Sequence, residues 1–216
     1  MKDTNWDLIK GSAAHEIEVL NQLSALNQIE AMVHFSLHHY PSPEHGCDRH
    51  LSQNALKELH RTGTFLLLEK PGEYRTGPVY LELENGEIVY NPPAVDEIQG
   101  HLERFFAQLG ERWGNYTPVE TAAFTLWFIN WVHPFKNGNG RSARGFCYAC
   151  LSMRAGYVLP GERTVLELIK ENDDEYQLAL RAADAAFQAT EEPDLAPMVG
   201  LIDRLFAEQL ESALEA

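Results

Sequence analysis

The residues from His133 to Arg144, HPFKNGNGRSAR, constrain the fold of this chain more than any other stretch. The preceding segment, TAAFTLWFINWV, has apolar residues at helical spacing and predicts a helix that ends beside His133. The following segment, ARGFCYACLSM, contains no proline and is again typical of a helix. The alternating asparagines and glycines between them tolerate left-handed backbone, so they favour a break in the helix. The sequence therefore predicts a helix, a tight loop and a second helix.

The loop between these helices has the composition of an anion-binding site. Residues 137–140, NGNG, can bring successive backbone N–H groups into a concave nest, and the next helix opens with free N–H groups. Arg141 and Arg144 share a helix face and can reach one ligand, while His133 is a candidate base. Each feature also has a simple structural interpretation as a turn or a helix end, and Phe135 is expected in the core. Their combination favours the handling of a phosphorylated substrate.

This segment resembles the signature of the Fic (Fido) family, HPFx[DE]GNGRxxR, and departs from it only at Asn137. Weaker similarities extend the resemblance from about Glu16 to the C-terminal region. In chain order they are Glu18-Val-Leu-Asn21 with Ala25-Leu26, Leu59-His60, Pro71-Gly-Glu-Tyr-Arg75, and Glu175-Tyr176 with Ala179-Leu180. The resemblance implies a mainly α, single-domain helical bundle with one β-hairpin flap. Residues 1–15 would be an N-terminal extension, 16–190 the core and 191–216 a C-terminal helix.

The usual reaction of that family is transfer of AMP from ATP to a hydroxyl of a target protein. A protein hydroxyl is a poor nucleophile at neutral pH, so a positioned base must accept its proton, and His133 suits that role. The loop can stabilise charge that develops on the phosphate oxygens. The residues implied in nucleotide or phosphate binding are Asn137, Gly138, Asn139, Gly140, Arg141, Arg144 and Tyr176, the last as part of the base pocket.

Asn137 occupies the position where the family has the Asp or Glu that binds Mg²⁺. An amide oxygen is a weaker ligand than a carboxylate because it is neutral, so the sequence predicts a weakened Mg²⁺ site. Three alternatives follow: slow AMP transfer, nucleotide binding without turnover as a binding or interaction module, or transfer of a different phosphate-containing group.

A β-hairpin is predicted over residues 78–91. Val79-Tyr-Leu-Glu-Leu-Glu alternates apolar and polar residues, Asn85-Gly86 suits a type I′ turn, and Pro92-Pro93 ends the return strand. The resemblance implies a flap that pairs with an extended stretch of the target protein, a form of strand addition. Its docking residues would be Val79, Tyr80, Leu81, Glu82, Ile88 and Val89. The alternative is a hairpin that only packs on the helices.

Length and charge limit the remaining functions. The chain has 216 residues, 44% of them hydrophobic, which is enough for one core and one domain. A formal net charge of −15 argues against nucleic-acid binding, which needs a basic face. Neither a signal segment nor a membrane-spanning run is present, so we expect a cytoplasmic protein with no membrane partner. Export as an effector by a specialised secretion system is compatible with this composition.

Cysteine and histidine clusters suggest metal sites only weakly. Cys147 and Cys150 form C-x-x-C within an apolar helical segment and are interpreted as buried small hydrophobes. His34 and His38 are one helical turn apart, but the neighbouring spacing through His45, Cys47 and His50 matches no zinc pattern. A solvated histidine-rich loop is favoured over a metal site.

Many Fic relatives carry an inhibitory helix, [ST]xxxE[GN], whose glutamate pairs with a motif arginine. Ser12-Ala-Ala-His-Glu16 has the first half of this spacing, but Ile17 follows. We interpret it as a chance match, with Ser12 as an N-cap and Glu16 as a first-turn charge. A separate inhibitory partner is one alternative.

Overall fold

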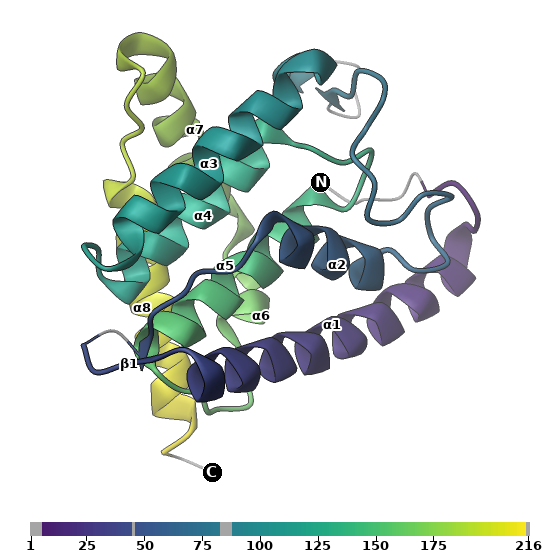
Figure 1. Cartoon of the computed structure of the whole chain (residues 1–216). Helices are drawn as coiled ribbons and strands as arrows, with labels where there is room; N and C mark the ends of the chain where they lie inside the picture. Colours follow the sequence, from purple (N-terminus) through teal and green to yellow (C-terminus); the bar gives the residue numbers. More distant parts are fainter. Residues whose placement is uncertain (1–5, 45, 83–87, 215–216) are drawn as a thin grey trace.

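The computed structural model describes residues 6–44, 46–82 and 88–214. It confirms a mainly α bundle with a small antiparallel hairpin (Figure 1). The helices are α1 Gly11–His39, α2 Gln53–Gly63, α3 Ile98–Trp113, α4 Pro118–Val132, α5 Asn139–Ala155, α6 Val165–Glu171, α7 Asp173–Thr190 and α8 Ala196–Ser212, with a 3₁₀ turn η1 at Val95–Glu97. The strands are β1 Pro41–Ser42, β2 Gly46–Cys47, β3 Leu81–Glu82 and β4 Ile88–Tyr90.

Helix α4 is the centre of the bundle. Its segment from Thr121 to Ile129 is buried without interruption, since no charged residue interrupts it. Pro118 stands at its first turn, and the Thr117 side chain accepts from the backbone N–H of Glu120, which fixes where the helix begins. The helices α3, α5, α7 and α8 contact α4, and α5 in turn contacts α1, α2 and α6. Most residues of α4 and α5 are therefore core residues.

Helix α1 runs along one side of the bundle, as the purple ribbon of Figure 1 shows. It begins at Gly11 after the N-cap residue Lys10, so the predicted boundary at residue 16 falls inside this helix. The expectation that Ser12 is an N-cap is wrong. Ser12 is already the second residue of the helix, and Lys10 makes no side-chain cap. Gly11 has φ +70, a left-handed conformation, and the helix begins two residues earlier than it would after a serine cap at position 12.

The segment between α1 and α2 forms a small sheet that the sequence did not predict. Pro41 pairs with Cys47 and Ser42 with Gly46. Gly46 has φ +70, and a Cβ there would lie 2.5 Å from the backbone of Gly156, so only glycine fits. The histidine-rich segment is thus anchored to the end of α5.

No set of three or more potential metal ligands gathers in the described residues, and His45 lies outside them. His34, His38 and His39 are exposed on the last turns of α1. The predicted burial of the helical cysteines is confirmed: Cys147 and Cys150 are buried and not disulfide-bonded. Burial raises the pKa of the Cys147 thiol to about 12, which leaves it an unreactive small hydrophobe.

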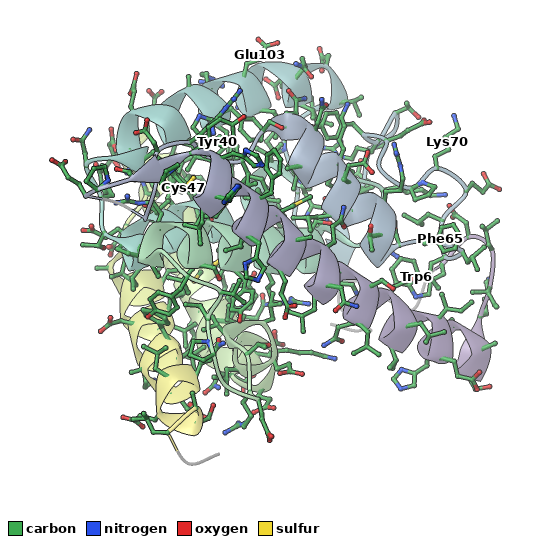
Figure 2. All side chains as sticks on the ribbon, turned by 60° about the horizontal axis from the view of Figure 1, so that its bottom comes forward. Trp6, Tyr40, Cys47, Phe65, Lys70 and Glu103 are labelled. Carbon is green, nitrogen blue, oxygen red and sulfur yellow. The ribbon has the colours of Figure 1, made fainter. Side chains whose placement is uncertain are left out.

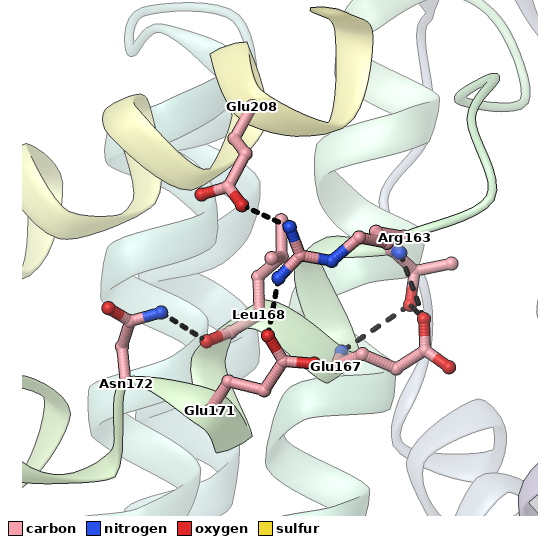
Figure 3. Close-up of polar contacts among 7 residues, drawn as sticks. Arg163, Glu167, Leu168, Glu171, Asn172 and Glu208 are labelled. Atoms are coloured by element: carbon pink, nitrogen blue, oxygen red, sulfur yellow. Dashed lines mark hydrogen bonds and ion pairs between the residues drawn. The ribbon is translucent and has the colours of Figure 1, made fainter. Parts of the chain in front are cut away.

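The C-terminal helices are joined by polar contacts at the surface (Figure 3). Arg163, just before α6, donates to Glu171 of α6 at 2.5 Å and to Glu208 of α8 at 2.7 Å. These groups are exposed to solvent, so the two ion pairs contribute little to stability. The network fixes the loop before α6 against α8. Across the described residues, none of the helices combines the length and the apolarity required to span a membrane.

Candidate active site

His133 ends the central helix in a left-handed conformation, with φ 49 and ψ 57. This conformation is unusual for a residue other than glycine and turns the chain sharply into the motif loop. Arg75 holds it there: Arg75 Nε donates to the His133 carbonyl at 2.8 Å, and the Arg75 backbone N–H donates to the Pro134 carbonyl at 2.9 Å. The strained corner is therefore fixed from the segment that precedes the hairpin.

The contacts of His133 favour one tautomer. Its Nδ1 lies 3.3 Å from the carbonyl oxygen of Asn130, which can only accept, so Nδ1 carries the proton and Nε2 is left as an acceptor. Burial, with a smaller contribution from the positive charge of Arg75, lowers the pKa of His133 to about 4, against the opposing effect of the Asn130 carbonyl. The imidazole is thus neutral at pH 7, the state that a general base requires.

The side chain of His60, in α2, packs against the motif loop and holds it in place. Its ring stacks on Phe135 with centroids 3.7 Å apart, and its Nδ1 accepts from the Gly72 backbone N–H at 2.8 Å. Its Nε2 therefore carries the proton and donates to the Asn137 carbonyl at 2.9 Å. The sequence pointed to His60 only through the Leu59-His60 pair, and the structure shows that this side chain positions the loop.

Gly138 is the position in the loop where glycine is obligatory. It is the N-cap of α5 with φ 75, and a Cβ there would lie 2.6 Å from the Thr64 methyl carbon. Gly140, by contrast, lies in the first turn of α5 and does not use positive φ. The expected left-handed freedom of both glycines is therefore needed only at Gly138. Gly140 instead leaves room for Arg144, whose Nη1 would be 3.3 Å from a Cβ at position 140.

Asn139 closes the loop through its side chain. Its Oδ1 accepts from the Phe135 backbone N–H at 2.8 Å, and its Nδ2 donates to the Phe135 carbonyl at 2.9 Å. The residue is only 2% exposed. With that side chain committed to the loop, any contact of Asn139 with an anion would use its backbone N–H, which lies in the unpaired first turn of α5.

Arg141 points toward the N-terminal part of the chain. Its Nη2 lies 3.0 Å from Glu18 Oε1 of α1, and its guanidinium lies 4.8 Å from the centre of the Trp6 ring. Trp6 is buried and donates its indole N–H to the same Glu18 oxygen. Burial raises the pKa of Glu18, but the bonds from Arg141 and Trp6 outweigh it, so the pKa is lowered and the carboxylate stays charged.

Glu18 is a residue of this site that sequence reasoning missed. Glu16, which carries the spacing considered for an inhibitory helix, is exposed, and Glu18 is the carboxylate that pairs with a motif arginine. The available signal was helical geometry: once α1 is known to begin at Gly11, Glu18 lies two turns in, on the side that faces α5. Arg141 Nη1 is buried and has no hydrogen-bond acceptor within the described part of the chain.

The residues just before α1 cover the motif as a strap, here defined as Trp6, Asp7 and Leu8. Figure 2 labels Trp6 and Phe65 close together near the start of α1. The backbone N–H groups of Asp7 and Leu8 donate to the Leu67 carbonyl, and Asp7 pairs with Lys136 of the motif at 2.6 Å. Residues 6–8 of the predicted N-terminal extension are therefore packed on the site.

Asn137 fits a magnesium ion poorly. Its Oδ1 accepts from the Gly138 backbone N–H at 2.7 Å, which turns the amide oxygen toward its own loop. The motif segment itself contains no carboxylate. A Mg²⁺ site normally rests on one or two carboxylates together with substrate phosphates. The residues at this position do not match that requirement.

Tyr176 of α7 is buried, with 2% of its surface exposed. Its hydroxyl accepts from Asn130 Nδ2 at 2.8 Å, and burial raises its pKa, while the charge of Arg144 opposes the shift. Tyr176 is thus connected to the helix that carries His133 and lies near the second motif arginine. Its role beside a nucleotide base stays a prediction.

The hairpin is shorter than expected. Leu81 pairs with Tyr90 and Glu82 with Ile88, with a register shift between Leu81 and Glu82. Val79 and Tyr80 precede the strand, and the predicted turn at Asn85-Gly86 lies outside the described residues. The pairing of β3 with β4 alone leaves outer edges free for a further strand within the described sheet. The docking role of this edge, including Val89, stays a prediction.

Arg75 and Tyr90 join this hairpin to His133. The terminal nitrogens of Arg75 donate to the carbonyls of Gly77 and Pro93, which flank the hairpin. The Tyr90 hydroxyl donates to the Trp131 carbonyl, and the Tyr90 and His133 rings lie 6.5 Å apart. The hairpin, the histidine and the N-terminus of α5 therefore form one site.

The comparisons agree with this architecture. Residues 50–151 match the model of the Fic/DOC family. The protein adenylyltransferase Fic of Drosophila persimilis is 35% identical over 92 residues, which cover 40% of this chain and 16% of that relative. The chain thus spans a small part of the curated relatives it matches.

Solved structures extend the likeness to nearly the whole chain. A Fic family protein from Desulfovibrio desulfuricans has a TM-score of 0.66 at 21% identity, covering 92% of this chain and 53% of that one. A Fic domain containing signaling protein from Bacteroides thetaiotaomicron has a TM-score of 0.66 at 22% identity, covering 91% and 70%. At this identity they show the fold alone. The family match identifies a Fic domain of the Fic/DOC family in residues 50–151, and the solved structures show the corresponding fold over most of the chain.

Proposed function

We propose that the protein transfers AMP from ATP to a hydroxyl side chain of a target protein. The proposal rests on a neutral His133 that lies close to the first turn of α5, whose backbone N–H groups have no partner within the helix. Arg75 holds His133 through its carbonyl, and His60 holds the loop before α5 through the Asn137 carbonyl. The curated Drosophila relative named protein adenylyltransferase supports it.

In this mechanism the target hydroxyl binds between the flap and His133. Nε2 accepts the hydroxyl proton as the oxygen attacks the α-phosphorus of ATP, and pyrophosphate leaves with the bonding electrons. The backbone N–H groups at the start of α5, from Asn139 to Arg141, stabilise the charge that develops on the phosphate oxygens. Arg144 and, after release from Glu18, Arg141 bind the outer phosphates. No step is assigned to Mg²⁺.

A catalytically silent nucleotide-binding module is the second candidate. The observation that favours it is the Asn137 amide, which replaces a charged ligand and bonds to its own loop. Transfer of a different phosphate-containing group remains a third alternative, because His133 and the start of α5 would serve it equally well.

The test is incubation of the protein with α-labelled ATP and a cell lysate, beside a His133→Ala variant. Label on protein that disappears in the variant is expected, and ATP binding should persist in both proteins. ATP binding without label in either protein would favour the silent module. Repeating the assay with label in the γ-phosphate distinguishes AMP transfer, which leaves the protein unlabelled, from phosphoryl transfer.

A further inference from the structure

A pocket of about 370 Å³ lies beside the flap on the side of α3 and α7. We call it the aromatic pocket. Its walls include Tyr90, Pro93, Glu97, His101, Trp131 and Phe187, and the polar residues Asn91 and Gln188 complete the lining. It belongs to no step of the mechanism above. It adjoins the site, however, because Trp131 lies two residues before His133 and its carbonyl accepts from the Tyr90 hydroxyl.

The walls of the pocket are aromatic rings set at steep angles. Trp131 and Phe187 lie 4.8 Å apart with their planes at 70°, and His101 meets Trp131 at 4.8 Å and 85°. Behind them Trp127 packs on both Trp131 and Phe187, which fixes their orientation. Ring faces held in this way carry negative charge density and attract cations.

The carboxylate near the pocket also favours the binding of a cation. Glu97 stands at its rim, and its carboxylate is held in place because Oε2 accepts from the Ala94 backbone N–H at 2.9 Å. Among the described lining residues there is neither a lysine nor an arginine. Two arginines contact lining residues, and both are engaged in hydrogen bonds: Arg104 donates to His101 Nδ1 at 2.7 Å, and Arg75 donates to the Pro93 carbonyl at 2.5 Å. The formal net charge of −15 adds a general attraction for basic partners.

We propose that the aromatic pocket binds a lysine or arginine side chain of the target protein, close to the hydroxyl that is modified. This inference rests on the proposed function, since it names the class of substrate that the same site selects. An extended chain advances about 3.3 Å per residue, and the Tyr90 and His133 rings are 6.5 Å apart. The basic residue is therefore expected within about two positions of the hydroxyl.

The test uses short acetylated peptides with one serine and, two positions away, lysine, arginine, norleucine or glutamate. Norleucine keeps the aliphatic stem of lysine and removes its charge. Binding is measured by isothermal titration calorimetry without nucleotide. We expect the lysine and arginine peptides to bind at least about fivefold more tightly than the norleucine peptide, as cation binding to aromatic faces allows.

Two variants connect this preference to the pocket. Phe187→Leu removes a ring face and should abolish most of the preference. Glu97→Gln keeps an acceptor for the Ala94 N–H but removes the charge, and should reduce the preference about twofold. Phe35→Leu is the matched control, because Phe35 is an exposed aromatic residue on α1 that belongs to no wall of the pocket.

Equal binding of the lysine and norleucine peptides would overturn the inference, as would no binding of any peptide at millimolar concentration. A preference that persists in both Phe187→Leu and Glu97→Gln would do the same. The peptides are then incubated with α-labelled ATP. A preference in binding without label on any peptide would contradict the proposed function alone, whereas label without preference for a basic residue would contradict this inference alone.

Discussion

The guanidinium of Arg75 connects the backbone of His133 to the base of the flap. Its Nε donates to the His133 carbonyl at 2.8 Å, while its terminal nitrogens reach the carbonyls of Gly77 and Pro93. One side chain thus sets the position of the candidate base relative to the strand that would hold the target. The glycine-x-x-arginine segment that resembles the Fic family is important in this structure because it supplies this arginine.

Arg75→Lys should lower AMP transfer at least about tenfold, because an ammonium cannot reach all of these carbonyls in the fixed geometry of a guanidinium. We expect a loss of about 1 to 3 kcal/mol in the free energy of unfolding, measured by urea denaturation. Arg49→Lys is the control, since Arg49 is exposed and, in the described contacts, its side chain meets Tyr40. Transfer at the parental rate in Arg75→Lys would contradict the positioning role.

Glu18→Gln should tighten ATP binding about five- to thirtyfold, because it removes the carboxylate that competes with phosphate for Arg141. Both side chains are partly exposed, at 22% and 26%, so a larger effect is not expected. Calorimetric titration with ATP measures the change. Glu16→Gln removes a charge from the exposed face of the same helix and should leave the affinity unchanged. An equal gain in ATP affinity in the two variants would contradict the role of Glu18, because it would show that ATP binding responds only to the net charge of the protein.

Asn137→Asp should increase the rate of AMP transfer and its dependence on Mg²⁺, because a carboxylate supplies the charged ligand that the amide lacks. Initial rates with α-labelled ATP are measured over a range of Mg²⁺ concentrations for both proteins. Equal rates at every concentration would refute the interpretation of Asn137 as a weakened ligand. Asn139→Asp serves as a comparison. It should destabilise the loop, because the Asn139 side chain donates to the Phe135 carbonyl and an aspartate cannot.

Gly138→Ala and Gly140→Ala form a matched pair within the loop. Gly138→Ala places a methyl group 2.6 Å from Thr64 at φ 75, so we expect a loss of about 2 to 4 kcal/mol of stability. Gly140→Ala lies in a helical turn, where the new methyl group meets the end of the flexible Arg144 side chain at 3.3 Å and Asn130 Oδ1 at 4.0 Å, so stability should hold or rise slightly. Thermal unfolding compares the two. Similar losses in both variants would contradict the assignment of positive φ to Gly138 alone.

The protein should lose stability as the pH falls from 6.5 toward 4. Burial lowers the pKa of His60 from 6.5 to about 4, so in this range the unfolded chain binds a proton that the folded chain does not. The stabilising contribution is fully present above pH 6.5, and about 3 kcal/mol of it is lost on acidification to pH 4. His60→Phe keeps the stacking on Phe135 but cannot titrate. Denaturation between pH 7 and 5 should show a shallower dependence in this variant, and equal slopes would refute the role of His60.

The sequence predicted the parts of the site that are local in the chain. The apolar run before His133 and the glycines after it fixed a helix, a loop and a second helix, because helical periodicity and left-handed backbone depend on neighbouring residues. For the same reason, the burial of Cys147 and Cys150 follows from the apolar composition of their helix. The predicted hairpin range, 78–91, extends beyond the described strands, which begin at Leu81 and end at Tyr90, because where pairing stops depends on how the two strands meet.

The contacts that make the site specific join residues far apart in the sequence. His60 and Asn137, Arg75 and His133, and Glu18 and Arg141 meet only because α5 packs between α1, α2 and α4. No local pattern encodes such pairs. Burial keeps His60 and His133 neutral, whereas the bonds from Arg141 and Trp6 keep the Glu18 carboxylate charged against the effect of burial. The sequence by itself determined a Fic-like motif with an uncharged amide at position 137. The tertiary structure decided which residues hold that motif in place, because packing sets both distance and solvent access.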